Sequence, residues 1–349
     1  MRNINPTRIL LLALAITVIF LSVTPVRGDS TCVDAAAATA AGERLVTSDG
    51  VKGIVGAMCS GATGAVLANV GMPNGMVMIS PSATSPALST VDDNGLFFRT
   101  APSDARQGVI MAELLKEKGY SSVAVTYTNN DYGKGLADSF TAAWEAAGGE
   151  VTIVAAHEDG KADYTAEVGA LASAGGDLLV VIGYVDQGGS GVIQAALDTG
   201  AFDTFQLPDG MISTTLEEKF GTDIDGSFGQ TPGSPAAEQF AEVVGESFDP
   251  TSVYADTGYD AAALIMLAMQ ASGSTDPMVY KDFVMGVANA PGEPIQPGEL
   301  GKGLQILADG GEIDYVGASS VELIEPGESA GSDREIEMID GDLSTIGYR

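Results

Sequence analysis

Short apolar runs alternate with amphipathic stretches along most of this chain, and this alternation limits the folds open to it. The runs are rich in Val, Ile and Met, as strands buried on both faces of a sheet are. Several of the stretches between them end in glycine, which commonly terminates a helix. Strands joined by helices in this order form parallel, doubly wound sheets, so we predict an α/β fold. The predicted strands are Val51–Ala57, Met76–Ser80, Ser122–Thr128, Val151–Ala156, Leu178–Tyr184, Thr204–Leu207 and Gly226–Thr231. The predicted helices include Ala35–Thr47, Asp104–Lys118, Gly135–Ala147, Tyr164–Ala174 and Gly191–Thr199.

The pattern changes after Thr231. Ala255–Ala271 is the most apolar helix predicted beyond the N-terminal segment, and Pro291–Pro297 is a connector rich in Pro and Gly. At the tail, two alternating runs flank Asp340-Gly341, which predicts a hairpin with a tight turn over Glu335–Tyr348. A length of 349 residues suits two domains of ordinary size.

The first 28 residues have the pattern of a secretory signal peptide. Arg2 and Arg8 supply its positive start, and the apolar run Ile9–Val23 is shorter than a typical membrane-spanning helix. Val26-Arg27-Gly28 places small side chains where a signal peptidase cleaves, and no Cys follows at the spacing of a lipid anchor. We therefore predict that residues 1–28 direct the protein to the periplasm.

The formal net charge of −31 bears on the partners of the chain. So acidic a protein repels nucleic acid and anionic membrane surfaces, and we expect neither as a partner. The charge indicates solubility in salty surroundings. An acidic surface that attracts cationic solutes is the alternative interpretation.

Cys32 and Cys59 are the two cysteines of the chain. In an exported protein an even number of cysteines most simply forms disulfides, so we predict a Cys32–Cys59 bond. The alternative is a catalytic thiol at Cys59, which needs a base, and His157 is the single histidine of the chain.

Motifs for binding phosphates or dinucleotides do not occur in this sequence. It has no phosphate-binding G-x-x-x-x-G-K loop and no G-x-G-x-x-G after a strand, and Gly188-Gly189-Ser190-Gly191 does not have the spacing of a G-x-S-x-G turn. One histidine and two paired cysteines leave too few ligands for a transition-metal cluster, so we expect no cofactor, no metal and no enzymatic activity. Two Ser/Thr-rich turns, Met58–Thr63 and Ser80–Pro86, instead follow predicted strands. Ligands of open α/β sheets bind at this edge, and such turns suit a carboxylate, although ordinary helix capping is equally compatible with them.

A series of motifs then carries a family resemblance. They are Asp29-Ser-Thr-Cys32, Cys59-Ser60, Met78-Ile-Ser-Pro-Ser-Ala-Thr-Ser-Pro86, Phe98-Arg99-Thr100, Asn130-Asp-Tyr-Gly-Lys-Gly135, Gly183-Tyr184, Leu207-Pro208-Asp209-Gly210 and Tyr259-Asp260-Ala261. Because these motifs occur in the same order as in the family, the chain resembles the branched-chain amino-acid-binding branch of the type I periplasmic binding proteins, from Asp29 to about Tyr259.

The resemblance implies two lobes joined by three crossing segments, with a ligand in the cleft between them. Lobe 1 is expected to comprise residues 30–120 and 250–322, and lobe 2 residues 121–249 and 323–349. The chain would then be the substrate-binding component of an ABC importer, a monomer that delivers an amino acid or a related small polar solute to a membrane permease. The alternatives are a ligand-sensing module of a receptor or regulator, and a truncated remnant that no longer binds.

The same resemblance assigns the ligand contacts. It places the α-carboxylate of an amino acid on Ser60 and Thr84. It places the α-ammonium on the carbonyl of Ser82 or Ala83, on the Thr84 hydroxyl and on Asp209, because a buried ammonium needs an anionic partner. Tyr132 and Tyr184 are expected to close over the ligand from lobe 2. Asp256 either faces a polar or cationic ligand or is a solvated helix-start residue.

The chain also departs from the family. Family members begin with a strand, a helix and a second strand before the D-x-x-C motif, whereas Asp29 here follows the signal directly. We therefore expect lobe 1 to lack these elements, through a genuine deletion or a gene-model error. Val51–Ala57 would then form an exposed sheet edge.

Overall fold

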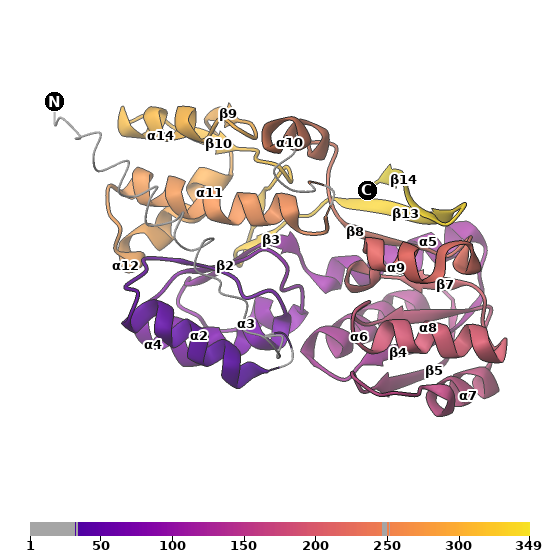
Figure 1. Cartoon of the computed structure of the whole chain (residues 1–349). Coiled ribbons are helices and arrows are strands. Elements are labelled where there is room, and N and C mark those ends of the chain that lie inside the picture. Colours follow the sequence, from indigo (N-terminus) through magenta and orange to yellow (C-terminus); the bar gives the residue numbers. More distant parts are fainter. Residues whose placement is uncertain (1–31, 33, 246–249, 251) are drawn as a thin grey trace.

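The computed structural model describes residues 32, 34–245, 250 and 252–349, and shows two lobes side by side (Figure 1). The predicted signal peptide, residues 1–28, lies outside the described residues. Each lobe contains one main sheet with helices on both faces (Figure 1). The predicted α/β class with doubly wound, mainly parallel sheets is therefore confirmed.

The first lobe contains a five-stranded sheet in the order β1-β2-β3-β12-β11. Four of its strands run parallel: β1 (Ile54–Val55), β2 (Met78–Ser80), β3 (Phe97–Pro102) and β12 (Glu328–Ser329). The fifth, β11 (Leu323–Ile324), is antiparallel to β12. β9 (Glu293–Ile295) and β10 (Ile313–Tyr315) form a separate parallel pair. The helices here are α2 (Ala35–Thr47), α3 (Ser60–Val66), α4 (Met72–Asn74), α10 (Ala237–Val244), α11 (Ala255–Ser272), α12 (Pro277–Tyr280), α13 (Val284–Ala288) and α14 (Leu300–Ala308). Shorter helical turns are η1 (Leu67–Gly71), η2 (Pro86–Thr90) and η5 (Lys281–Phe283).

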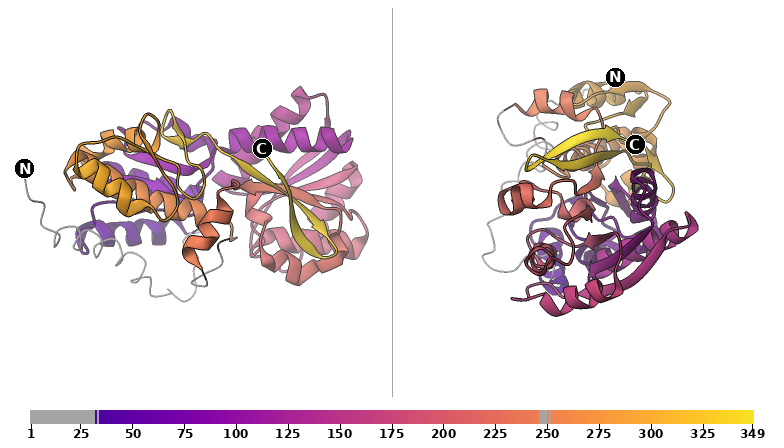
Figure 2. Two further views of the ribbon diagram at one scale, coloured as in Figure 1. Left: turned by 90° about the horizontal axis from the view of Figure 1, so that it is seen from above. Right: turned by 90° about the vertical axis from the view of Figure 1, so that its right-hand side faces the viewer.

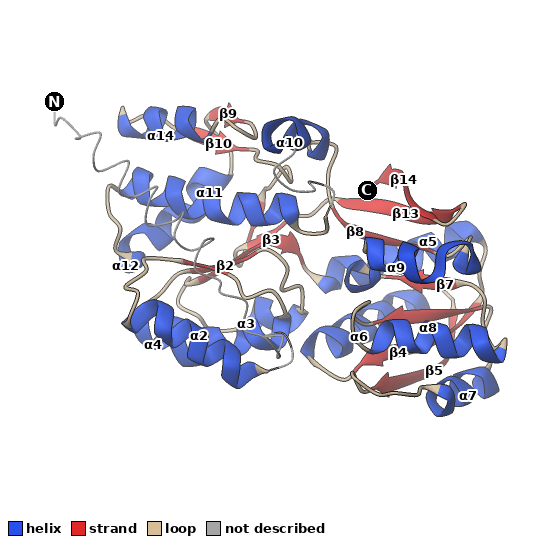
Figure 3. Cartoon of the chain, viewed as in Figure 1, coloured by secondary structure: helices blue, strands red, loops and turns tan. Residues whose placement is uncertain are grey.

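The second lobe contains a seven-stranded sheet in the order β14-β13-β8-β7-β6-β4-β5 (Figure 3). Five of its strands are parallel: β4 (Ser122–Thr128), β5 (Glu150–His157), β6 (Leu178–Ile182), β7 (Phe205–Leu207) and β8 (Phe228–Pro232). β13 (Asp333–Ile339) and β14 (Asp342–Tyr348) form the predicted tail hairpin, which pairs antiparallel with β8. The helices are α5 (Asp104–Lys118), α6 (Asp131–Ala146), α7 (Thr165–Ala174), α8 (Gly188–Thr199) and α9 (Thr214–Phe220), with turns η3 (Asp209–Met211) and η4 (Gly221–Ile224).

Alternating side chains on the strands form a core on each face of each sheet. In β2 and the residue before it, Val77 and Ile79 pack against α11, while Met78 packs with α2 and α3 on the opposite face. Because successive residues of a strand point to opposite faces, one apolar run can supply both cores. This explains why the predicted strands are continuously apolar.

Helix α5 packs on a different lobe from the one predicted. Its residues Ile110, Met111 and Leu114 share a core with Phe140 and Trp144 of α6, so α5 belongs to the second lobe. This packing places the boundary between the lobes near residue 103, whereas the predicted boundary is at residue 120. An amphipathic pattern shows which face of a helix is buried but not against which sheet it is buried.

Two further boundaries also differ from the prediction. Helix α10 lies against the first lobe, since the Phe240 and Tyr259 ring centroids are 5.2 Å apart. Strands β11 and β12 complete the first-lobe sheet, and the chain enters the second lobe only at β13. Three described segments, residues 102–103, 232–234 and 330–332, therefore join the lobes, and Figure 2 shows the last of these leading into β13.

β1 lies at the outer edge of the first-lobe sheet and pairs with β2. The edge position of this strand was predicted, but the observed strand is much shorter than Val51–Ala57. Within the described ranges, no helix has the length and apolar character needed to cross a membrane.

Candidate functional site

The carboxyl ends of the strands of the two lobes point toward each other, and the lobes are in contact there (Figure 1). Helix α3 of the first lobe meets α6 of the second, because a methyl group on Gly61 would lie 3.6 Å from Oδ2 of Asp131. A methyl group on Gly135 of α6 would likewise lie 3.2 Å from Oγ of Ser85. These close approaches leave little room between the lobes and define the closed arrangement.

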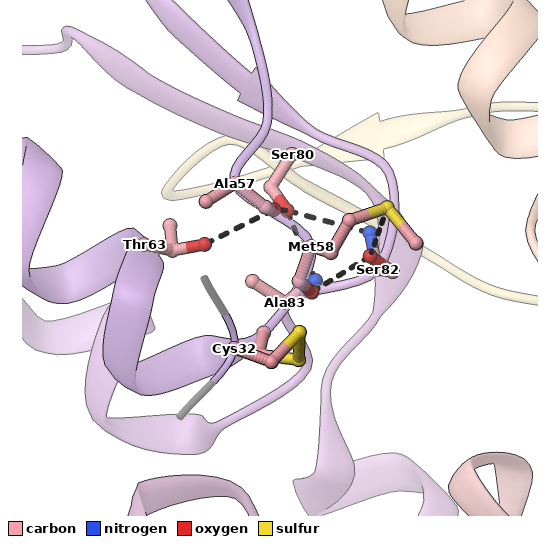
Figure 4. The surroundings of a disulfide bond; sticks show 8 residues. Cys32, Ala57, Met58, Thr63, Ser80, Ser82 and Ala83 are labelled. Carbon is pink, nitrogen blue, oxygen red and sulfur yellow. Dashed lines mark hydrogen bonds between the residues drawn. A yellow bond between two sulfur atoms is a disulfide. The ribbon is translucent and has the colours of Figure 1, made fainter. Parts of the chain in front are cut away.

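On the first lobe, a serine-rich turn is held by its own hydroxyl groups (Figure 4). Ser80 donates its hydroxyl hydrogen to the Ala57 carbonyl at 2.7 Å and accepts from the Ala83 N–H at 3.0 Å. Ser82 donates to the Met58 carbonyl at 2.7 Å. Ser82 therefore joins the two polar turns to each other.

The predicted disulfide lies beside this turn (Figure 4), and Cys59 is the residue immediately before α3. Cys32 and Cys59 are bonded, with their Cα atoms 5.0 Å apart. The bond confirms the prediction and excludes the catalytic thiol at Cys59. His157 ends β5 in the second lobe, where it is buried beside the Thr126 hydroxyl at 2.9 Å, and so has no relation to Cys59.

Ser60 and Thr84, both predicted ligand contacts, are buried polar residues of the first lobe. Ser60 is the first residue of α3, and its Oγ accepts from the Ser85 N–H at 3.1 Å, which leaves its own O–H able to donate. The Thr84 hydroxyl is buried and has no hydrogen-bond partner among the described residues. A buried polar atom without a partner is costly, so a ligand or water is the expected partner.

Arg99 fixes the serine-rich turn through hydrogen bonds to its carbonyl groups, a role that the sequence did not predict. Its side chain is 1% exposed, and one of its nitrogens donates to the carbonyls of Ala83 and Ser85, both at 3.0 Å. The other nitrogen bonds to Ser89 and to the Glu328 carboxylate. The Ala83 carbonyl, predicted to accept the ligand's ammonium, therefore already accepts a hydrogen bond from Arg99.

On the second lobe, Asp209 is the centre of a hydrogen-bond network. Its carboxylate accepts from the Tyr132 hydroxyl at 2.9 Å and from the Tyr254 hydroxyl. The rings of Tyr132 and Tyr184 stack with their centroids 5.2 Å apart. The structure thus brings the predicted residues Tyr132, Tyr184 and Asp209 together, and adds Tyr254, which precedes α11.

A second buried carboxyl lies next to Asp209. Asp104, the first residue of α5, is fully buried, and its N–H donates to the Thr84 carbonyl at 2.9 Å. Burial raises the pKa of Asp104, and the nearby Asp209 charge raises it further, against the opposing effect of Thr84 and Arg99. Burial also raises the pKa of Asp209, although its Tyr254, Gln107 and Tyr132 hydrogen bonds oppose the increase.

The structure places Asp256 apart from the Asp209 network. It occupies the first turn of α11, is 7% exposed, and accepts from the Thr257 N–H at 2.8 Å. Burial raises its pKa to about 6, with Asp260 raising it and Arg334 lowering it. Of the two interpretations left open, a solvated helix start is therefore wrong, because the carboxyl group is buried.

Sequence patterns signalled these additional residues only weakly. Asp104 follows a helix-capping Ser103, so it has the pattern of an ordinary first-turn acid. Arg99 stands in a fully buried strand, where a charge is unusual, and it belongs to the Phe98-Arg99-Thr100 motif, but neither signal shows which groups it bonds. Among the described residues, no group of three or more His, Cys, Asp or Glu side chains has the arrangement of a metal site.

Comparisons with known proteins give the family context. The model of a family described as periplasmic binding protein matches residues 30–281. A Leu/Ile/Val-binding protein homologue of Brucella melitensis is 30% identical over 66% of this chain and 63% of its own length. A substrate-binding protein of a chemotactic signal transduction system of Halobacterium salinarum is 24% identical over 79% of this chain and 66% of its own length. The chain thus spans just under two thirds of the length of these curated relatives.

Solved structures show the same fold. A leucine-binding protein of Thermotoga maritima superposes with a TM-score of 0.77 at 21% identity, covering 96% of this chain and 92% of that one. A branched-chain amino acid transporter substrate-binding protein of Streptococcus pneumoniae, solved with isoleucine, has a TM-score of 0.72 at 20% identity, covering 95% and 91%.

Proposed function

This chain belongs to the periplasmic binding protein family, and we propose that it captures a small amino compound between its lobes for an ABC importer. The observation that carries the proposal is the buried Asp209 carboxylate, which lies near Asp104, a residue whose N–H donates to the Thr84 carbonyl of the other lobe. A ligand that bears both an ammonium and a carboxylate complements these two walls. Amino acids are the simplest such ligands.

In the proposed complex, each charged group of the ligand meets its own wall of the cleft. The carboxylate lies at the Ser60 hydroxyl and the start of α3, while the ammonium lies between Asp209 and Thr84. A carboxylate loses its hydrogen bonds to water on burial, and nearby backbone N–H groups and hydroxyls replace them. Tyr132 and Tyr184 cover the ligand from the second lobe.

Closure follows from this division of contacts. A ligand that touches both lobes binds the closed state more tightly than the open state, so it shifts the population toward closure. We propose that the closed form, as a monomer in the periplasm, docks on a membrane permease. No chemistry on the ligand is expected.

A sensing role is the second candidate function. The Halobacterium salinarum relative is named as a substrate-binding protein of a chemotactic signal transduction system, which favours this candidate. Both functions need the same ligand-driven closure. They differ in the membrane partner, which is a permease in one case and a receptor in the other, and a pull-down from native membranes with the liganded protein distinguishes them.

A thermal-shift screen of the protein lacking residues 1–28 tests the binding proposal. Ligand at 100 times its Kd adds about 2.7 kcal/mol to the free energy of unfolding, so a binding amino acid raises the melting temperature. Asp209→Asn keeps the shape of the side chain but removes the charge, and we expect it to weaken binding by about 2–5 kcal/mol.

Asp138→Asn is the matched control, because Asp138 is an exposed carboxylate on α6 and the substitution removes the same charge. A cooperative melt that no amino acid shifts would contradict amino-acid binding. An equal loss of binding in the Asp138 variant would show that net charge, not the Asp209 contact, controls affinity.

A further inference from the structure

The segments that join the lobes lie side by side and bury polar groups between them. The Gly233 N–H of the second segment donates to the Ser332 carbonyl of the third at 3.0 Å. Ser329, just before the third segment, is paired with Pro102 of the first in the sheet. Any motion of one lobe relative to the other must therefore bend or twist these three segments together.

Two carboxyl groups stand immediately after these segments, and both are fully buried. Asp104 follows the first segment and Asp333 follows the third, and each has 0% exposure. Neither oxygen of either carboxyl makes a close hydrogen bond among the described residues, although nearby Thr84 lowers the pKa of Asp104 and nearby Arg106 lowers that of Asp333. The cation nearest Asp333 is Arg106, whose Nε is 3.6 Å away and whose side chain is 41% exposed.

Further polar groups around the crossing segments are also buried without partners. Both amide atoms of Gln230 and the hydroxyl of Thr231, which lead into the second segment, have none among the described residues. Asp256, on the first turn of α11, is a third buried carboxyl, and unlike the other two it accepts a close hydrogen bond, from the Thr257 N–H at 2.8 Å. Unpaired carboxylates are too costly to keep charged in such surroundings, whereas protonated carboxyls are much less costly.

We propose that the crossing segments form a proton-operated latch, in which Asp104, Asp256 and Asp333 hold protons in the closed arrangement and ionise when the lobes separate. Separation of the lobes admits water to these carboxyl groups, so ionisation and opening favour each other. Protonation and closure favour each other for the same reason. The latch needs no ligand.

The charged neighbours of each group support this assignment. Asp104 on α5 faces two other acidic groups, Asp209 from η3 and Asp333 from β13. The one cation that it faces, Arg99 from β3, is already bonded to Glu328. Asp333 faces Arg106 from α5 and Asp209. Asp256 faces Asp260 from α11 and Arg334 from β13. The tyrosines around Asp209 are Tyr132, Tyr184 and Tyr254, and burial raises the pKa of each, which keeps them neutral.

The direction of the pH effect follows from these shifts. Burial raises the pKa of Asp256 and of Asp333 to about 6, and it raises the pKa of Asp104 as well. A hydrated carboxyl in open lobes has a pKa near 3.9. The closed state therefore binds more protons than the open state. Protonation of these carboxyls stabilises the closed state fully below about pH 4, and this stabilisation is lost as the pH rises through about 6.

Small-angle X-ray scattering of the ligand-free protein tests the latch. We expect the radius of gyration to be smallest at pH 5 and to rise toward pH 8, with most of the change between pH 5.5 and pH 7. Near-UV circular dichroism at each pH checks that both lobes stay folded. A radius of gyration that is constant over this range in folded protein would overturn the proposal.

The double variant Asp256→Asn with Asp333→Asn mimics the protonated pair. We expect its radius of gyration at pH 8 to match that of the unaltered protein at pH 5. The control is Asp138→Asn with Asp177→Asn, which removes the same two charges from exposed sites. An equal effect of the control would assign the change to net charge and refute the latch. If the double variant does not fold, the pH series of the unaltered protein decides alone.

The latch and the binding proposal fail separately. The scattering series contains no ligand, so its result does not depend on which solute binds. The thermal-shift screen at one pH does not depend on the crossing carboxyls. A protein that closes with falling pH but binds no amino acid would keep the latch and remove the amino-acid assignment.

Discussion

At the scale of single residues, Arg99 connects the serine-rich turn to the rest of the first lobe. The guanidinium fixes two carbonyls of the Ser80–Pro86 turn and reaches Glu328 on β12, which lies next to β3 in the sheet. Its planar fork of N–H donors can hold several acceptors at once, which a lysine cannot do with the same geometry. Arg99 therefore positions the turn, while the Ser60 and Thr84 hydroxyls remain available to the proposed ligand.

We predict that Arg99→Met destabilises the protein by about 3–5 kcal/mol, since it leaves buried carbonyls and a partly buried carboxylate without their partner. Urea unfolding measures the change. Lys134→Met removes an exposed ion pair on α6 and should leave the unfolding midpoint unaltered. A similar small effect for both variants would show that the Arg99 network adds no net stability.

At the scale of elements, the fit of α6 against β4 depends on one small residue. A methyl group at Gly133, in the first turn of α6, would lie 2.1 Å from the Thr128 carbonyl oxygen at the end of β4. The Gly133 N–H is also capped by the Asn130 side chain at 2.9 Å. This cap explains why α6 begins at Asp131, four residues before the predicted start at Gly135.

We predict that Gly133→Ala lowers stability, because the β4 backbone must move to relieve the contact, and that it also weakens ligand binding, because Tyr132 moves with the turn. Overpacking of this kind costs about 1–3 kcal/mol. Gly169→Ala on α7 is the matched control, since no atom lies within 4 Å of its added methyl group. In a helix interior that change should stabilise by about 0.5–1 kcal/mol. Thermal melts of both variants, with and without ligand, measure the difference.

At the scale of the whole molecule, 47 acidic side chains face only 16 basic ones. Most carboxylates therefore have no cation to pair with, and the folded state brings their like charges closer together than the unfolded state does. The two lobes share this excess, so repulsion acts within each lobe and between them. Dissolved salt is the remaining source of counterions.

We predict that the melting temperature rises steadily as NaCl is increased from 0.01 M to 1 M, because the screening length falls from about 30 Å to about 3 Å. Differential scanning calorimetry at pH 7.5 measures the change. Sucrose at the same osmolality is the control for general solute effects and should give a smaller increase. A melting temperature that is independent of salt would indicate that repulsion among the acidic side chains costs the fold little.

The sequence by itself determined the character of each segment and the chemistry available to the cleft. Apolar runs became strands and the amphipathic stretches became helices, because local periodicity records which faces are buried. The Cys32–Cys59 bond and the grouping of Tyr132, Tyr184 and Asp209 were also predictable, the first from cysteine number and export, the second from motifs in family order.

Only the tertiary structure decided which distant segments meet. The packing of α5 on the second lobe, the contact of Tyr254 with Asp209, and the burial of Asp104 and Asp333 beside the crossing segments have no local signature. Short-range patterns encode how much of a residue is buried, but the partner that buries it comes from elsewhere in the chain. The acidic residues show this most clearly, because 47 of them look alike in the sequence and only their place in the fold separates a solvated surface carboxylate from a buried one.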